Sequence, residues 1–200
     1  MNVNRRNFIR AGAALATLAA TIPTTVAKAA MPLNLSLLER AKNALNQHRA
    51  VIANRDVIGI ADFGAGSEAE RFHIIDLRNG MTNSMLVAHG KGSDPGHTGW
   101  LQRFSNVPGS NATSQGAYLT ASEYVGQHGR SRRLIGLDPE NDEAEARAIV
   151  LHSASYVSPA IATGQGRIGR SLGCLAVSRQ DLATAMGRLP PGSLIYAGKS

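Results

Sequence analysis

From residue 56 onward the chain alternates short apolar segments with turn-forming residues, and this alternation constrains the fold more than any other feature. The first three segments are residues 57–62, 71–77 and 82–89, and Asn79-Gly80 between the last two is typical of a β-hairpin turn. The 21 glycines among 200 residues favour many turns over a helical bundle. The pattern therefore predicts an antiparallel β-meander in a mainly β, α+β domain.

The rest of the chain adds strands, a few flanking helices and one long polar segment. Leucine and alanine at helical spacing predict a helix over residues 32–50, and further helix is expected at 142–147 and 178–189. The polar segment 94–115 is rich in Gly, Ser, Asn and Pro, and a loop of this length in a small domain is usually functional. We expect it to line or cover a site. Additional strands are predicted at residues 116–120, 132–137, 148–153 and 193–197.

The N-terminus has the pattern of an export signal. Arg5 and Arg6 precede a weakly apolar, uncharged run, and Ala27-Lys28-Ala29 offers small residues for cleavage. The paired arginines favour the twin-arginine route. We predict a twin-arginine-type signal peptide at residues 1–29 and a single domain at 30–200, located in the periplasm or otherwise outside the cytoplasm. An uncleaved N-terminal anchor is the alternative, although the run is short and alanine-rich for a membrane span.

The charge of the chain argues against nucleic-acid binding. Removing the four basic residues of the predicted signal lowers the formal net charge from +7 to +3. Because no run of lysine and arginine is interleaved with aromatic residues, we expect no nucleic-acid partner. A mildly basic exported protein does suit an anionic polymer such as the bacterial wall. No cofactor is expected, and the six histidines lack the spacing of a zinc site.

Cys174 is the only cysteine, and it follows a glycine-rich stretch, residues 166–173. A lone thiol in an exported protein is either a buried small hydrophobe or a reactive group. His152 ends an apolar, strand-like run 22 residues earlier, and a histidine there is either a structural residue or a base. We predict that Cys174 is a nucleophile and that His152 is its general base, because a thiol attacks as its thiolate.

Several neighbours of these two residues are candidates for supporting roles. The backbone amides of Gly173 and Cys174 are predicted to form an oxyanion hole, and Ser171 to fix the turn. The basic side chains nearby are expected to bind substrate carboxylates, arginine through a bidentate fork, unless they form only a solvated face. The predicted substrate-binding residues are Arg167, Arg170, Lys91 and His89, whereas a structural role is assigned to His48, His73, His97 and His128.

The stretch from Gly166 to Cys174, preceded by residues 149–158, resembles the murein L,D-transpeptidase catalytic-domain family (YkuD-like). In that family a histidine is followed, after a variable loop, by Ser/Thr-x-Gly-Cys, and Ser171-Leu172-Gly173-Cys174 fits this pattern. The resemblance extends through residues 87–92, 104–106 and 124–129, and it covers roughly residues 35–197. It implies a β-sandwich or barrel with a few flanking helices.

The resemblance also implies an activity on peptidoglycan stem peptides. The cysteine matching Cys174 would attack a peptide carbonyl, release the terminal D-alanine and transfer the acyl group to an amine of a second stem. An L,D-carboxypeptidase would use the same site with water instead of the amine. A catalytically silent wall-binding domain is a third reading, and it depends on departures from the family pattern at Leu172 and Leu175.

Overall fold

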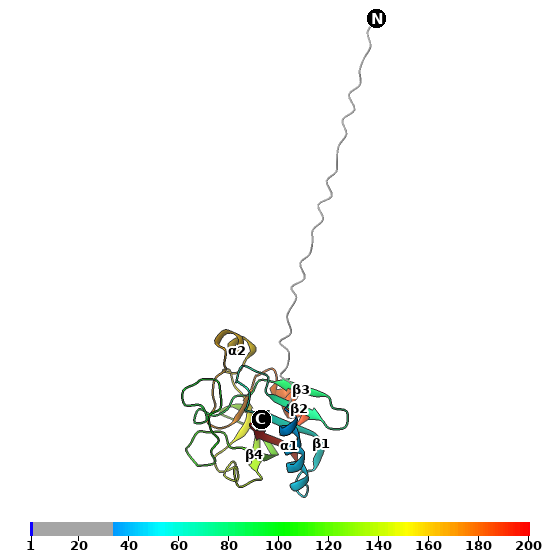
Figure 1. Cartoon of the computed structure of the whole chain (residues 1–200), viewed down its shortest axis with the longest axis vertical. Helices are drawn as coiled ribbons and strands as arrows, with labels where there is room; N and C mark the ends of the chain where they lie inside the picture. Colours follow the sequence, from blue (N-terminus) through cyan, green and yellow to red (C-terminus); the bar gives the residue numbers. More distant parts are fainter. Residues whose placement is uncertain (2–33) are drawn as a thin grey trace.

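The structure, a computed structural model, describes Met1 and residues 34–200, so the predicted signal peptide, apart from Met1, lies outside the described residues (Figure 1). One mixed sheet of eight strands organises this part of the chain, in the order β3-β2-β1-β8-β4-β5-β6-β7. Neighbouring strands are antiparallel except for the parallel pairs β1–β8 and β6–β7. The prediction of a mainly β fold is confirmed. The strands are β1 (Asn54–Asp62), β2 (Phe72–Asp76), β3 (Thr82–Met85), β4 (Gly116–Gly126), β5 (Gly129–Gly136), β6 (Val150–Ser153), β7 (Leu175–Val177) and β8 (Ser193–Gly198).

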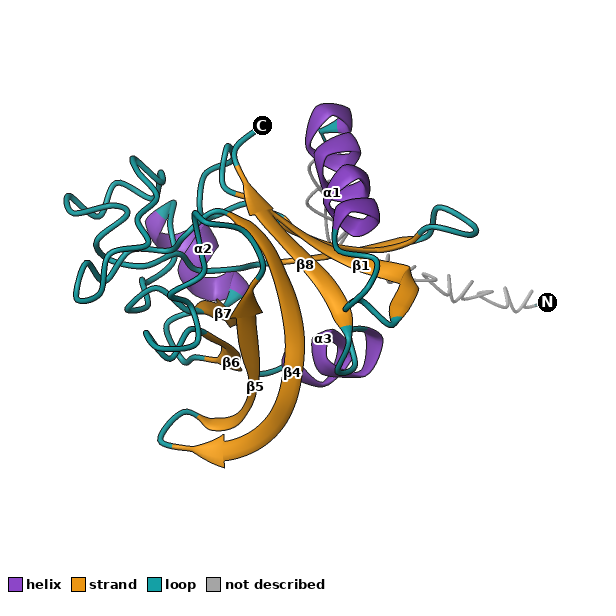
Figure 2. Ribbon diagram, turned by 90° about the horizontal axis from the view of Figure 1, so that it is seen from below, coloured by secondary structure: helices purple, strands orange, loops and turns teal. Residues whose placement is uncertain are grey.

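The predicted meander is present as β1, β2 and β3, but its third strand is shorter than expected. Pairing with β2 ends at Met85 rather than at His89, because the chain then changes partner. Ala88 forms a single antiparallel bridge to Ala176 of β7. β3 and β7 are the two edge strands of the sheet. Because the segment that follows β3 pairs with β7, the curved sheet of Figure 2 approaches a closed barrel.

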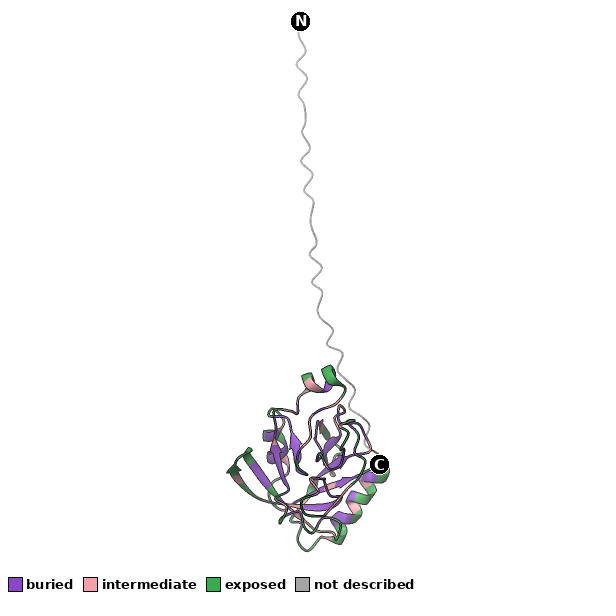
Figure 3. Cartoon of the chain, turned by 90° about the vertical axis from the view of Figure 1, so that its left-hand side faces the viewer, coloured by how far each residue is buried: buried purple, intermediate pink, exposed green. Residues whose placement is uncertain are grey.

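Two helices cover opposite faces of the sheet at β1 (Figure 2). The predicted first helix is α1 (Leu35–Gln47), and Asn34 caps it by accepting hydrogen bonds from the amides of Ser36 and Leu37. Because side chains alternate along a strand, Ile58 and Ile60 share a core with α1. Ala61 of the same strand belongs to the core that includes α3 (Leu182–Arg188). The centre of the sheet is accordingly buried on both sides (Figure 3).

Two helix predictions need correction. Residues 142–147 form turns rather than helix, and the last helix begins at Leu182 rather than near Ser178. A helix that was not predicted, α2 (Pro159–Gln165), lies between β6 and β7. Ser158 caps it through a hydrogen bond from the Ile161 amide, and Gly166 ends it in a left-handed conformation, with φ of 64°. Among the described residues, no helix is long and apolar enough to cross a membrane.

The predicted long loop is irregular throughout and packs on the glycine-rich turn before β7. Gly90 lies so close to Gly173 that an added Cβ would be 2.8 Å from the Gly173 Cα. The Thr113 hydroxyl donates a hydrogen bond to the Gly173 carbonyl at 3.2 Å, and it accepts one from the Gly90 amide at 2.9 Å. The loop therefore supports the segment that carries the cysteine. That it lines or covers a site stays a prediction.

Candidate active site

The parallel pairing of β6 with β7 brings the two predicted catalytic residues onto one face of the sheet. His152 pairs with Ala176, and Leu151 pairs with Leu175. Cys174 comes directly before β7, so the same register sets it beside Val150. Since side chains alternate along each strand, Cys174 and His152 point to the same side, two residues apart along the sheet. Diagonal neighbours on one face of a sheet lie about 7–8 Å apart, within reach of an aromatic side chain such as that of His152.

The Cys174 thiol is free and only 8% exposed. Its sulfur donates a hydrogen bond to the Ala148 carbonyl, with an Sγ–O distance of 3.6 Å. Burial raises the pKa of the thiol, while hydrogen bonds from the amides of Val150 and Cys174 and the charge of Arg147 act in the opposite direction. Because burial dominates, the resting form is the neutral thiol.

Arg147 and Ala148 form the turn before β6 and lie close to the Cys174 sulfur. Ala148 has a φ of 55°, a left-handed conformation that is unfavourable for alanine. Its carbonyl oxygen accepts the hydrogen bond from the thiol. Arg147 donates hydrogen bonds to the carbonyls of Ser105 and Ala112, so it ties the long loop to the site. No role was predicted for either residue from the sequence, where the one available signal is a basic residue just before the strand that ends at His152.

The turn residues Ser171 and Gly173 are held by a local network. The Ser171 hydroxyl donates to the Cys174 carbonyl at 2.7 Å, and it accepts from the Gly173 amide at 3.1 Å. Gly173 has a φ of 121°, and an added Cβ would lie 2.8 Å from the Ala112 carbonyl oxygen. Only glycine fits this position. The amide of Gly173 is already hydrogen-bonded, so an oxyanion hole that uses it needs that bond to Ser171 to break.

His152 is buried, and its orientation fixes its tautomer. Nδ1 lies 2.9 Å from the Ser153 carbonyl oxygen. Because a carbonyl only accepts, Nδ1 carries the proton and Nε2 keeps a lone pair. Burial lowers the pKa of His152, and the neighbouring His128 adds to that effect. The ring of His128, at the end of the β4–β5 hairpin, stacks on it with centroids 4.4 Å apart. His128, for which a structural role was predicted, thus contacts the candidate base.

The predicted substrate-binding residues occupy different surroundings. The Arg170 guanidinium donates to the carbonyls of Asp94 and Pro95, so it ties two loops together. Arg167 is partly buried next to Gly99. Lys91 is exposed, and its backbone amide donates to the Ser171 carbonyl at 2.8 Å. Substrate binding by these side chains stays a prediction.

His89, the fourth predicted substrate-binding residue, lies inside the domain in a buried network. An Arg71 nitrogen, which can only donate, lies 2.8 Å from His89 Nδ1. Nε2 therefore carries the ring proton and faces Asp94 Oδ2 at 3.5 Å. Burial and the Arg71 charge lower the pKa of His89 to about 3. A binding role for His89 also stays a prediction, since its ring contacts protein groups here.

The other histidines for which a structural role was predicted have protein partners. His48 Nε2 lies 2.7 Å from an Asp138 carboxylate oxygen, and His73 Nδ1 lies 2.8 Å from the Ser84 hydroxyl. His97 Nε2 lies 3.0 Å from the Ile168 carbonyl oxygen. In the described part of the chain, no three His, Cys, Asp or Glu side chains are grouped so that they could hold a metal ion.

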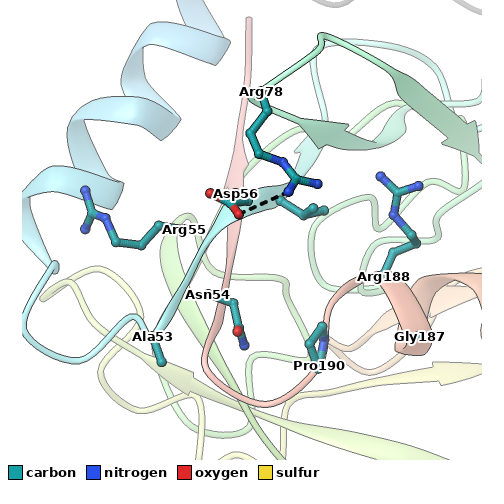
Figure 4. A pocket seen from close by; sticks show the side chains of 9 residues that line it. Ala53, Asn54, Arg55, Asp56, Arg78, Gly187, Arg188 and Pro190 are labelled. Carbon is teal, nitrogen blue, oxygen red and sulfur yellow. Dashed lines mark ion pairs between the residues drawn. The ribbon is translucent and has the colours of Figure 1, made fainter.

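Of two cavities in the structure, one borders a predicted catalytic residue and the other does not. The first, about 450 Å³, lies between β1 and the end of α3 (Figure 4). Arg78 and Arg188 line it, and Arg78 Nη1 lies 3.6 Å from Asp56 Oδ2. None of the predicted site residues borders that cavity. The second, about 530 Å³, is lined by His152, by His128 and by residues 153–156. This cavity therefore opens onto the candidate base.

Comparison with known proteins supplies a family match. A family model described as the L,D-transpeptidase catalytic domain (YkuD type) matches residues 28–197. No curated protein matches the chain. Three similar solved structures are an L,D-transpeptidase from Mycobacterium smegmatis (15% identity, TM-score 0.44), one from Mycobacterium tuberculosis H37Rv (15%, 0.45), and L,D-transpeptidase 3 from Mycobacterium tuberculosis with a faropenem-derived adduct (14%, 0.46). Each match covers 72% of this chain and 58%, 58% and 60% of the respective structure, so the chain spans about three fifths of their length.

Proposed function

The chain belongs to the family of L,D-transpeptidase catalytic domains, and on this premise we propose that it is a cysteine acyltransferase acting on peptidoglycan stem peptides. The observation that carries the proposal is the pairing of β6 with β7, which puts Cys174 and His152 on one face. A second supporting observation is the hydrogen bond between Nδ1 of His152 and the Ser153 carbonyl. Because Nδ1 carries the ring proton in this bond, Nε2 is able to accept a proton. Since peptidoglycan is part of the bacterial cell wall, we propose that the protein works outside the cytoplasm.

The first half of the reaction is acylation of the sulfur. Nε2 of His152 takes the thiol proton as Sγ attacks the peptide carbonyl carbon, and the carbonyl oxygen becomes an oxyanion. Cleavage of the peptide bond then releases the amine of D-alanine, which takes the proton back from His152. A thioester remains on Cys174. The cationic Arg147 lies next to Gly173. Its charge stabilises the oxyanion that forms on this side of the site.

The thiol must turn before this step, because its hydrogen bond in the resting structure is to Ala148. Rotation about χ1 among its staggered positions moves the sulfur away from that carbonyl and toward His152. We propose that binding of the donor stem favours the rotated position. The Ala148 carbonyl then serves as the resting partner of a neutral thiol.

The second half of the reaction uses an amine. The amine of a second stem attacks the thioester carbonyl while His152 takes its proton, and the sulfur leaves and recovers that proton as a thiol. The products are a cross-linked peptide and free enzyme. Water in place of the amine would give a trimmed monomer, which is the carboxypeptidase outcome.

A muropeptide assay with donor and acceptor stems tests the proposal. Wild-type protein is expected to form cross-linked dimer, and His152→Gln to form it about 10²- to 10⁴-fold more slowly, the usual contribution of a general base. Products are separated by liquid chromatography and identified by mass. Trimmed monomer alone would replace the transferase by the carboxypeptidase, and no product from folded, reduced protein would favour the silent wall-binding domain.

A pH profile tests whether the resting pair is neutral. Since burial lowers the pKa of His152, its base form persists below the ordinary value of about 6.5. The rate of acylation by a carbapenem should therefore rise with pH and level off with a midpoint below that value. Burial raises the pKa of Cys174, so alkylation by iodoacetamide should have a midpoint above the ordinary value of about 8.5. Rapid alkylation in acid would instead indicate a thiolate–imidazolium pair.

A further inference from the structure

The cavity beside His152 has a cationic lining with no acidic residue. It holds about 530 Å³ and is formed by the end of the β4–β5 hairpin, the segment after β6 and the start of the last helix. Two arginines contribute charge. The lining residues are Gln127, His128, Gly129, Arg130, His152, Ser153, Ala154, Ser155, Tyr156, Arg179 and Leu182.

The two arginines differ in whether their charge is available. Arg130 donates to both carboxylate oxygens of Glu123, so its charge is balanced within the hairpin. Arg179 is exposed and, within the described residues, its side chain has no hydrogen-bonding or ionic partner. It also lines an adjoining cavity of about 250 Å³. A free guanidinium at a polar cavity favours a carboxylate, which it can bind through two parallel hydrogen bonds.

The cavity lies on the far side of the base from the nucleophile. Along β6 the sulfur lies beside Val150, His152 comes two residues later, and the cavity continues from there along residues 153–156. Cys174 itself does not line it. Tyr156 links the two sides, because it borders the cavity and its backbone carbonyl accepts from the Gly169 amide of the turn that leads to Cys174. A molecule in this cavity would meet His152 while the acyl group occupies the sulfur.

We propose that this cavity is the acceptor subsite and that Arg179 selects an acceptor amine that carries a free carboxylate. The inference rests on the proposed acyl transfer and deepens it by naming the chemical class of the second substrate. The carboxylate pairs with Arg179, and the amine of the same molecule reaches His152 to give up its proton. Arg179 is therefore a specificity-determining residue for the second half of the reaction.

Two acceptors that differ in one group test the inference. Both are stem peptides with the same amine, one with the free carboxylate next to that amine and one with the carboxamide in its place. With wild-type protein, the KM for the carboxylate acceptor is expected to be lower. Arg179→Gln should raise that KM about tenfold, the loss of one charge-assisted interaction, and leave the KM for the carboxamide acceptor as it is in wild type. Arg179→Lys, which keeps the charge but not the fork, should restore part of the preference.

The control is Arg49→Gln, which removes an exposed arginine just beyond α1, and it should leave the KM of both acceptors unchanged. Thermal unfolding of each variant checks that it is folded. Equal KM values for the two acceptors with wild type, or an equal rise for both in Arg179→Gln, would overturn the inference while the transfer stands. Absence of cross-linked product from wild type with either acceptor would overturn the proposed transfer itself, and the inference with it.

Discussion

Cys174→Ala is expected to abolish both acylation and transfer, with a loss of at least about a thousandfold, because it removes the only thiol of the chain and with it the nucleophile. Intact mass after mixing with a carbapenem is the measurement. Wild-type protein should gain the mass of one inhibitor molecule and the variant should gain none. The thiol occupies a nearly closed position at the end of the turn, so the adduct also shows that the sulfur can leave its resting contact with Ala148.

Cys174→Ser is the matched control, since it keeps the size and a hydroxyl donor for Ala148. It should fold as wild type does and gain an adduct far more slowly, because serine lacks the nucleophilicity of a thiol at this site. An adduct on Cys174→Ala would contradict the assignment of the nucleophile. A wild-type protein that is folded and reduced yet takes no adduct would contradict the proposal that this thiol is activated.

Arg71→Met is expected to lower the free energy of unfolding by about 3–5 kcal/mol, the range for removing one partner from a buried charged network. Arg71 is fully buried, and its guanidinium donates to the carbonyls of Ala65 and Val87 and faces His89 Nδ1. The variant leaves those acceptors without a donor. Urea unfolding followed by tryptophan fluorescence provides the measurement.

Arg71→Lys separates the charge from the hydrogen bonds. It keeps a cation in the same place but has only one nitrogen to donate to acceptors on two chain segments. The free energy of unfolding of Arg71→Lys should therefore lie between those of wild type and Arg71→Met. Arg133→Met is the control for removing an arginine that lies over an aromatic ring: Arg71 lies over Phe63, and the exposed Arg133 lies over Tyr124. A loss below about 1 kcal/mol in Arg71→Met, as expected for an exposed site, would show that the network contributes little.

The elements with a strong local signal could be predicted from the sequence. Helical spacing of apolar residues gave α1, and Asn79-Gly80 gave the hairpin of β2 and β3. The signal for α2 was also present, since Ser158-Pro159 and Gly166 are typical ends of a helix. It was missed because the glycines before Cys174 suggested a loop. Strand ends were less predictable: Leu86, Val87 and Ala88 continue the apolar run of β3, but tertiary pairing with β7 redirects them.

The candidate site was predictable in its residue types but not in its contacts. Cys174 and His152 stand out in the sequence because one is unique and the other ends an apolar strand. Arg147 and Ala148 come near the sulfur only through the turn before β6, and no local pattern announces a left-handed alanine. Likewise, Arg179 meets His152 at one cavity because a hairpin and a helix start converge there. Convergence of distant segments is a property of the fold.

The place of β8 in the sheet has a consequence for biosynthesis. This strand, the last in the described chain, pairs with β1 on one side and with β4 on the other. While a nascent chain is being made, the group β1–β3 and the group β4–β7 remain two partial sheets with unpaired inner edges. Neither can complete the domain until β8 has been synthesised and inserted between them. Contacts so distant along the chain slow folding, so the eight strands can join into one sheet only after β8 has been made.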